Sequence, residues 1–468
     1  MFVNRSKEIK RIKTALQQPK AVLIVVYGRR RCGKSTLLKK VICENDIYFA
    51  ADLREKSLQI EAFAKSVEKI VTGFSKLKYP DWDSLFHNLK STLNKKITIC
   101  IDEFPYLVKN SPELPSLLQN IIDNKINDTY NLILCGSSQQ MMQSITLHST
   151  SPLYGRCDEI INVKPMLLGW YNEYFGTSPI VTIEGYSVFG GVPRYWELQK
   201  RYQSLADSIK YNILDPDGVL FKEPEILFYD EMRTSVMAFS ILTLIGLGCN
   251  RLSEIAGRLE KPATQLNRPI KLLIDLGYIR RETPFNTSLK STKKSLYKIS
   301  DPFMNFYFSF VIPNKSRLEF GLIDQVWSEI KEKFNQYVSE QWEELCRNAI
   351  PRLKIGGKTF NPAQRWWGKG TDRKPMEIDV VAESTDKSVL LLGEAKWINN
   401  IQVNKIAGEL KAKVKNAPFI RNQKIIYVLF LKQIPAKTSD EMIIITPDDI
   451  IREGLGEGLG GLGGLGKV

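Results

Sequence analysis

The sequence predicts a multidomain α/β protein that begins with a parallel β-sheet covered by helices. Three observations lead to this fold class: a glycine-rich loop between an apolar strand and a helix, three helical patterns followed by two short strands, and acidic strands near the C-terminus. The length of 468 residues suits about three domains of ordinary size. We expect domains at 1–200, 201–320 and 321–452, and a disordered Gly/Leu tail at 453–468.

The first domain alternates apolar strand patterns with helical ones. Continuous apolar strands separated by helices indicate a parallel sheet that is covered on both faces. The strand candidates are 21–27, 47–50, 97–101 and 131–135, and helical stretches include 58–74 and 114–126.

Residues 22–36, VLIVVYGRRRCGKST, join an apolar strand to a helix through a glycine loop. This order and spacing are those of a phosphate-binding loop. The glycines let backbone N–H groups point at an anion, and the start of the helix adds a positive dipole. We therefore expect ATP and Mg²⁺ as cofactors, with Lys34 on the phosphates and Ser35 on the metal. The expected cofactor-binding residues of the loop are Gly28, Gly33, Lys34, Ser35 and Thr36.

Acidic residues follow a second apolar strand, in the segment ITICIDEF. Ligands bind at the carboxyl ends of the strands in such sheets. We expect Asp102 to contact the Mg²⁺ shell and Glu103 to polarise the attacking water. A third strand ends at Ser137, which we expect beside the γ-phosphate, although ordinary turn chemistry also explains a serine there.

Residues 231–312 predict a winged helix-turn-helix, in which three helices precede a β-hairpin. The third helix turns Gln265, Asn267 and Arg268 outward, where they suit base edges and phosphates. A winged helix that only packs between domains is the alternative. The predicted helices are 235–246, 252–260 and 264–276, the predicted strands are 278–282 and 295–299, and the basic wing comprises Arg280, Arg281, Lys293 and Lys294.

Two strand patterns of the last third carry two acids and a lysine. Asp379 lies in one pattern, while Glu394 and Lys396 alternate on the next and therefore share a face. This is the pattern of a PD-(D/E)XK nuclease centre, in which Asp379 and Glu394 would bind Mg²⁺ and Lys396 would activate water. We expect Glu343, rather than Glu344, to add an acid from the helix upstream. A nuclease-like fold without cleavage is the alternative.

Together these motifs resemble the archaeal-type AAA+/STAND-like P-loop ATPases that carry a winged helix and a C-terminal PD-(D/E)XK nuclease-like domain. The resemblance implies a P-loop ATPase parallel sheet, then an α-helical lid and winged helix-turn-helix, then an α/β restriction-endonuclease-like domain. It also implies that Arg156 and Arg194 sense the nucleotide. The segments that carry the resemblance, besides the phosphate loop, are Ser151–Arg156, Gly190–Arg194, Tyr337–Cys346, Arg365–Gly368, Glu377–Asp379 and Gly393–Trp397.

The formal net charge of +15 favours a polyanionic partner, nucleic acid first. With the predicted winged helix, the expected partner is duplex DNA. The chain has no apolar run long enough for a transmembrane helix and no signal segment, so we expect a cytoplasmic protein without a membrane partner. The sequence leaves open whether the chain forms a homo-oligomer.

Two functions fit these observations. The first is an ATPase that couples nucleotide state to DNA binding and to metal-dependent cleavage of nucleic acid. The second is a nucleotide-dependent switch or scaffold that binds a protein partner and carries an inactive nuclease-like domain.

Overall fold

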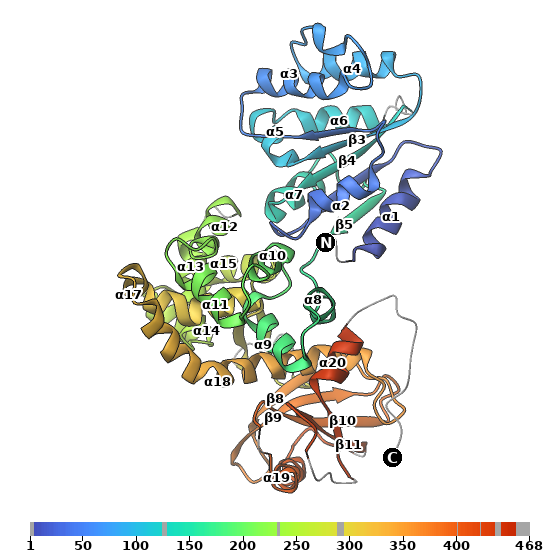
Figure 1. Cartoon of the computed structure of the whole chain (residues 1–468). Helices are drawn as coiled ribbons and strands as arrows, with labels where there is room; N and C mark the ends of the chain where they lie inside the picture. Colours follow the sequence, from blue (N-terminus) through green and yellow to red (C-terminus); the bar gives the residue numbers. More distant parts are fainter. Residues whose placement is uncertain are drawn as a thin grey trace. The chain divides into compact units, whose positions relative to one another are not determined.

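The chain divides into two compact units (Figure 1). The first comprises Met1–Pro165 with Tyr229–Arg233, and the second comprises Met166–Phe228 with Thr234–Val468. In the described part of the chain no helix is both long and apolar enough to cross a membrane. The computed structural model describes residues 4–123, 129–231, 235–287, 294–399, 401–421, 423–435 and 441–454. Almost all of the tail expected at 453–468 lies outside these residues.

The first unit is built on a five-stranded parallel sheet, which confirms the predicted α/β class. The strand order is β2-β3-β4-β1-β5, with helices on both sides (Figure 1). The three middle strands, β3, β4 and β1, are buried along their whole length, as expected for apolar strands in a covered parallel sheet. The strands are β1 Leu23–Tyr27, β2 Ile47–Ala50, β3 Ile97–Asp102, β4 Tyr130–Gly136 and β5 Glu159–Asn162.

The edge strand β5 is one that the sequence did not predict. It has only four residues, and just one of them, Ile161, is buried. A short edge strand of this kind lacks the continuous apolar run that identified the others. The helices of the unit are α1 Ser6–Leu16, α2 Lys34–Val41, α3 Lys56–Val67, α4 Trp82–Thr92, α5 Phe104–Asn110, α6 Leu114–Asp123 and α7 Gln139–Thr146.

The second unit begins with helices that the sequence analysis grouped with the ATPase domain. The domain boundaries at 200 and 320 therefore stay predictions, because the first unit already ends at Pro165. Those helices are α8 Leu168–Phe175, α9 Pro179–Phe189 and α10 Pro193–Gln199. They are followed by α11 Leu205–Ile209 and by α12 Glu223–Glu231, whose last three residues fall in the first unit.

The elements predicted between residues 231 and 312 are present in this second unit. Three helices precede an antiparallel pair of strands. Gly277, with φ of +77°, follows the third helix in the left-handed conformation that suits a glycine there. Whether these elements form a DNA-binding winged helix stays a prediction. They are α13 Ser235–Gly246, α14 Leu252–Arg258, α15 Ala263–Asp275, β6 Ile279–Glu282 and β7 Leu296–Ile299.

A long helix and a mixed sheet complete the second unit. The sheet order is β12-β11-β10-β9-β8, in which β8, β9 and β10 pair antiparallel and β10, β11 and β12 pair parallel. The helices are α16 Pro302–Phe306, α17 Lys315–Glu319, α18 Ile323–Ala349, α19 Val403–Lys415 and α20 Pro447–Gly454. The strands are β8 Gln364–Lys369, β9 Pro375–Glu383, β10 Val389–Lys396, β11 Lys424–Leu431 and β12 Ile443–Ile445. Short 3₁₀ segments lie at Phe74–Lys76, Ile312–Asn314 and Ile350–Arg352, and π-helical segments lie at Lys210–Leu214 and Tyr307–Val311.

Candidate functional site

The glycine loop after β1 has a backbone that only glycine permits at its first position. Gly28 has φ of +149°, and a Cβ there would run into the backbone carbonyl of Val163. Gly33, with φ of +86°, is the residue before α2. The Lys34 side chain is buried, and its Nζ donates to the carbonyl oxygens of Gly28 (2.8 Å) and Arg29 (3.0 Å). The loop therefore folds around the ammonium group of its own lysine.

Asp102, the last residue of β3, connects the loop to the sheet. Its Oδ2 accepts hydrogen bonds from Ser35 Oγ (2.7 Å) and from the Tyr48 hydroxyl (2.6 Å). Burial opposes ionisation of Asp102, but the bonds from Tyr48 and Ser35 outweigh it and lower the pKa of this carboxyl. Asp102 therefore presents an ionised carboxylate beside the serine hydroxyl of the loop.

Glu103 and Ser137 meet at the same edge of the sheet. Glu103 Oε2 accepts from both the backbone N–H (3.1 Å) and the Oγ (2.8 Å) of Ser137. Glu103 has φ of +54°, a left-handed conformation that is costly for a residue with a side chain and that occurs often at functional sites. Since β4 lies between β1 and β3, Ser137 stands between the glycine loop and the two acids.

Three further residues are expected at the nucleotide, and their roles there stay predictions. Thr36 is exposed on α2. Arg156 precedes β5, so it lies at the amino ends of the parallel strands, opposite the glycine loop, where its Nε and Nη2 donate to Asp123 (2.7 and 2.6 Å). Arg194 belongs to the second unit and pairs with Glu197 (2.7 Å). The structure thus brings neither arginine to the loop within the first unit, and their role in sensing the nucleotide stays a prediction.

The two acids and the lysine of the C-terminal motif do come together. Asp379 on β9 and Glu394 on β10 lie on paired strands, and both side chains are buried. Lys396 Nζ lies 3.0 Å from Glu394 Oε2 and 3.3 Å from Asp379 Oδ2. Lys413 Nζ on α19 donates to the other oxygen of Glu394 (2.6 Å). The cluster therefore holds two carboxylates between two ammonium groups.

The electrostatics of this cluster disfavour further negative charge. Burial, and then the charge of Asp379, raise the pKa of Glu343 to about 7 and raise the pKa of Glu394 as well. Burial opposes the charge of Lys396, but Asp379 and Glu394 outweigh it and raise the pKa of the lysine. The charge of Asp379 thus acts on Glu343, whose part as an additional acid of the site stays a prediction.

A Mg²⁺ ion fits the oxygen donors of Asp379 and Glu394. Two neighbouring carboxylates can hold a Mg²⁺ ion that keeps most of its waters. Among the residues that the structure describes, no group of three His, Cys, Asp or Glu side chains is placed to hold a metal. Asp379 and Glu394 are the two carboxylates that could hold the ion, and the pKa of Glu343 responds to the charge of Asp379.

A buried ion-pair network links this cluster to the hairpin of β6 and β7. Glu344 pairs with Arg280 on β6 (3.1 Å) and with Arg347 (2.9 Å). Arg347 Nη1 donates to the backbone carbonyl of Asp379 (2.9 Å). Glu344, the acid that the sequence analysis set aside, therefore belongs to a cationic environment rather than to the carboxylate pair.

The structure differs from the predicted basic wing at Arg280. Its side chain is 25% exposed, and its guanidinium pairs with Glu282 (2.9 Å) as well as with Glu344. Arg281 donates to Ser295 Oγ (2.9 Å). Arg280 is therefore engaged inside the unit rather than presented to a partner; Lys294 is exposed, and Lys293 lies outside the described residues.

Sequence reasoning missed Tyr48, Lys413 and Arg347. Tyr48 was one aromatic residue in a predicted strand, and its role depends on β2 pairing with β3. Lys413 is one of several lysines on α19, and no local signal separates it from them. Arg347 follows the Glu343–Glu344 pair by one helical turn, which was the available signal for an i,i+3 or i,i+4 partner.

The sheet order, the glycine loop and the acids at the end of β3 define the first unit as a P-loop ATPase domain. Residues 2–197 match the family described as an ATPase domain predominantly from Archaea. Residues 307–407 match a family described as Archaea bacterial proteins of unknown function.

Similar proteins support the same assignment. The uncharacterized protein MJECL04 of Methanocaldococcus jannaschii is 32% identical over 459 residues, which cover 96% of this chain and 100% of that protein. The chain therefore belongs to the same family as this archaeal protein. An uncharacterized ATP-binding protein of the same organism, MJ0423, is 48% identical over 42 residues, 9% of this chain and 71% of its own.

Among solved structures, the Walker-type ATPase PABY2304 of Pyrococcus abyssi has the same fold. It superposes with a TM-score of 0.52 at 20% identity and covers 66% of this chain and 96% of its own.

Proposed function

We propose that the chain hydrolyses ATP with Mg²⁺ at the glycine loop and that the nucleotide state controls the binding of nucleic acid by the second unit. The hydrogen bond of 2.7 Å between Ser35 Oγ and ionised Asp102 carries the first part of this proposal. It joins the loop hydroxyl and the strand-end carboxylate that hold a nucleotide-bound Mg²⁺ in P-loop ATPases.

Each residue of this site has a distinct part in the proposed reaction. Lys34 binds the β- and γ-phosphates, and Ser35 and Asp102 hold the metal. The Mg²⁺ supplies positive charge that offsets the charge developing on the phosphates. Glu103 orients the attacking water, and the two bonds from Ser137 hold its carboxylate in place before the nucleotide arrives.

The decisive experiment is ATP binding and hydrolysis by the full chain and by Lys34→Ala. The variant should lose tight ATP binding, because it removes the point charge on the phosphates. Lys69→Ala, a change of an exposed lysine of the same unit, is the matched control and should bind like the wild type. Equal ATP affinity in all three proteins would contradict the proposed nucleotide site.

A second activity, metal-dependent cleavage of a phosphodiester, is supported by the cluster on β9 and β10. The observation that favours it is the contact of Lys396 with both Asp379 and Glu394. The two carboxylates would hold Mg²⁺, and Lys396 would orient water and offset charge at the scissile phosphate. Plasmid nicking by the wild-type chain in Mg²⁺ or Mn²⁺ tests this activity.

We further propose that the second unit binds duplex DNA through α15. Gln265, Asn267 and Arg268 are all exposed on this helix, while Leu266 between them is buried. Polar and basic side chains at a helix start suit a major groove. The competing function is a switch that binds a protein partner through the same helix, and the salt dependence of DNA binding separates the two.

A further inference from the structure

The turn between β8 and β9, residues 370–374, carries positive charge that none of the functions proposed above uses. Lys369 ends β8, and Arg373 and Lys374 lie in the turn. All three side chains are exposed, and in the part of the chain that the structure describes none of them is in an ion pair. Asp372 is the one acid of this segment, and its Oδ1 accepts a hydrogen bond from the backbone N–H of Lys374 (3.0 Å). Three cations and one acid leave the segment with a net charge of +2.

Hydrogen bonds fix this turn to the end of α19. The backbone N–H of Thr371 donates to the carbonyl oxygen of Asn416 (2.9 Å), and its Oγ1 donates to Oδ1 of the same residue (3.1 Å). Within the turn, the N–H of Gly370 donates to the carbonyl of Lys374 (2.9 Å), and the N–H of Arg373 donates to the carbonyl of Gly370 (2.9 Å). The cations therefore stand on a fixed backbone, which lowers the entropic cost of presenting them to a partner.

The end of α19 leads from this turn to the carboxylate cluster. Lys413 lies three residues before Asn416, so the two residues share one face of the helix. Its Nζ donates to Glu394 Oε1 (2.6 Å). Three residues of helix rise only about 4.5 Å. A polyanion that lies on the turn is therefore separated from the carboxylates by about one helical turn and one lysine side chain.

The opposite end of β9 has no such charge. The turn between β9 and β10 holds one acid, Asp386, which pairs with Lys358 (2.5 Å), and one cation, Lys387. Lys374 is five residues from Asp379 along β9, and Lys387 is eight. At about 3.3 Å per residue these separations are roughly 17 and 26 Å. The positive charge is therefore at the end of β9 that is nearer to the cluster.

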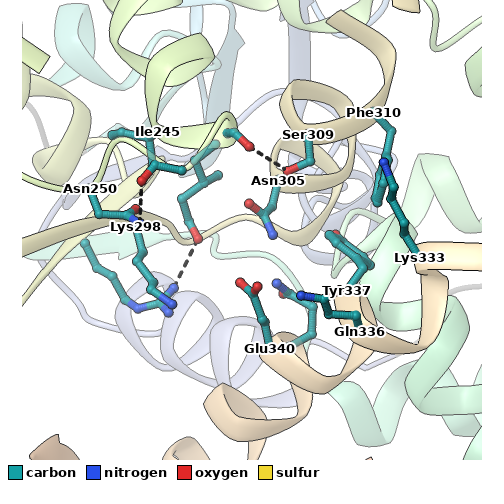
Figure 2. A pocket seen from close by; sticks show the side chains of 15 residues that line it. Ile245, Asn250, Lys298, Asn305, Ser309, Phe310, Lys333, Gln336, Tyr337 and Glu340 are labelled. Carbon is teal, nitrogen blue, oxygen red and sulfur yellow. Dashed lines mark hydrogen bonds between the residues drawn. The ribbon is translucent and has the colours of Figure 1, made fainter. Parts of the chain in front are cut away.

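The cations of the pocket beside α18 are arranged differently. In this pocket of about 290 Å³, Lys298 and Lys333 lie on opposite sides (Figure 2). Burial raises the pKa of Glu282, but nearby cations, Arg280 first and Lys298 among them, outweigh it and lower the pKa of this carboxyl. Lys298 is therefore engaged with an acid inside the unit, whereas the cations of the turn face solvent.

We propose that the turn at residues 370–374, beside the end of α19, binds the phosphate backbone of duplex DNA next to the carboxylate cluster. Arg373 and Lys374 each contact one phosphate. Such contacts position a duplex without reading its sequence. The inference rests on the proposed cleavage of nucleic acid, for which it adds the surface that holds the substrate, and it is distinct from the proposed contact of α15.

Binding of a labelled duplex to the full chain over a range of salt concentrations tests the proposal. The titrations contain EDTA, so that binding is measured without metal-dependent cleavage. The double variant Arg373→Gln, Lys374→Gln should weaken binding on the order of tenfold and lower the slope of log affinity against log salt by about 1.8, because two phosphate contacts are lost. Arg373→Lys should keep the slope of the wild type, because the charge remains.

Two control variants separate charge from structure. Lys387→Gln matches Arg373→Gln, since both residues have a left-handed backbone (φ of +61° and +65°) in a turn at one end of β9. It should leave the salt slope unchanged. Thr371→Val removes a hydrogen bond to Asn416 without changing the charge, and it should leave the slope unchanged as well.

Wild-type affinity and salt slope in the double variant would overturn the proposal. An equal loss in Lys387→Gln or in Thr371→Val would also overturn it, because the effect would then come from overall charge or from the shape of the turn. Arg268→Ala in the same assay separates this surface from α15. A loss confined to Arg268→Ala supports α15 and overturns the present proposal, a loss confined to the turn variant does the reverse, and a wild-type chain that does not bind DNA contradicts both. Nicking is measured apart, so DNA binding through the turn without nicking would support this surface and contradict only the proposed cleavage.

Discussion

The two carboxylate sites of this chain differ in how their negative charge is balanced. At the glycine loop, hydrogen bonds from Tyr48 and Ser35 outweigh burial and keep the pKa of Asp102 low. In the cluster on β9 and β10, burial and the charge of Asp379 raise the pKa values of Glu343 and Glu394. The carboxylate of the first site is therefore ionised, whereas Glu343 and Glu394 of the second keep their protons to a higher pH than free glutamates do. The hydrogen-bond donors and charges around a buried carboxyl therefore decide whether its pKa is lowered or raised.

The largest expected effect tests whether the first site is ready for catalysis. Glu103→Gln should bind ATP as the wild type does, because the phosphate contacts of the loop are unchanged. Hydrolysis should slow by at least about a hundredfold, because the amide cannot polarise water. Single-turnover hydrolysis with a parallel binding titration measures both quantities, and Glu44→Gln, a change of an exposed acid, is the control. Full turnover by Glu103→Gln would show that another group positions the water.

The second prediction tests whether Asp379 and Glu394, in the cluster on β9 and β10, bind a metal ion. Asp379→Asn should weaken Mg²⁺ or Mn²⁺ binding there by more than about tenfold and abolish any nicking, because a two-carboxylate site loses half of its charged ligands. ATP hydrolysis should continue, because it depends on the other unit. Calorimetric titration of the full chain with Mn²⁺ in the absence of nucleotide, beside a plasmid-nicking assay, measures both effects.

Two further variants make this second test specific. Glu394→Gln should reproduce the loss, whereas Glu409→Gln, on the exposed face of α19, should not. If the wild-type chain neither binds metal nor nicks DNA, the cluster is not catalytic and the C-terminal domain is only nuclease-like.

Local chemistry explains why the first site could be predicted from the sequence. The spacing of Gly28 and Gly33 requires a particular loop, and the apolar run before Asp102 requires a strand that ends at the ligand edge of a parallel sheet. The approach of Ser35 to Asp102 follows from these two facts. The neighbourhood of Glu394 and Lys396 was predictable in the same way, since alternation along a strand places these two side chains on one face.

Tertiary packing explains what could not be predicted. A basic hairpin looked suited to DNA, yet Arg280 pairs with Glu344 because α18 lies beside it. The expected place of Arg156 came from resemblance, and its contact with Asp123 depends on where α6 ends. Lys413 reaches Glu394 because α19 packs near β10, which its own segment does not reveal.

The third prediction concerns how the stability of the region around Glu343 depends on pH. The pKa of Glu343 is about 7 in the folded protein, because burial and Asp379 oppose its charge, with Arg347, Lys298 and Arg365 acting in the opposite direction. A free glutamate has an ordinary pKa of 4.5. The folded state therefore binds more protons than the unfolded state between these two values, and the free energy of unfolding falls as pH rises through that window.

Glu343→Gln removes this titration and should stabilise the region around β9 and β10 at high pH. The difference from wild type should grow between about pH 5 and pH 8 to the order of 3 kcal/mol, the equivalent of the pKa shift. Hydrogen exchange of β9 and β10 peptides in EDTA, compared at each pH with Glu332→Gln on the exposed face of α18, measures it. If the difference in stability between Glu343→Gln and wild type does not change with pH, burial does not raise the pKa of Glu343.

The smallest effect concerns the proposed DNA contact of α15, which lies outside both carboxylate sites. Arg268 is exposed, whereas Arg280 is held inside the unit by its ion pair with Glu344. Arg268→Ala should weaken binding to duplex DNA several-fold and lower the slope of log affinity against log salt by about 1, because one phosphate contact is lost.

Arg280→Ala should instead act through the protein, by freeing Glu344 and disturbing the Arg347 contact with the Asp379 carbonyl. Its salt slope should stay close to that of wild type, and Arg201→Ala, a change of another exposed arginine, should alter neither quantity. If Arg268→Ala and Arg201→Ala bind DNA alike, α15 is not the DNA contact and the helix is free to serve a protein partner.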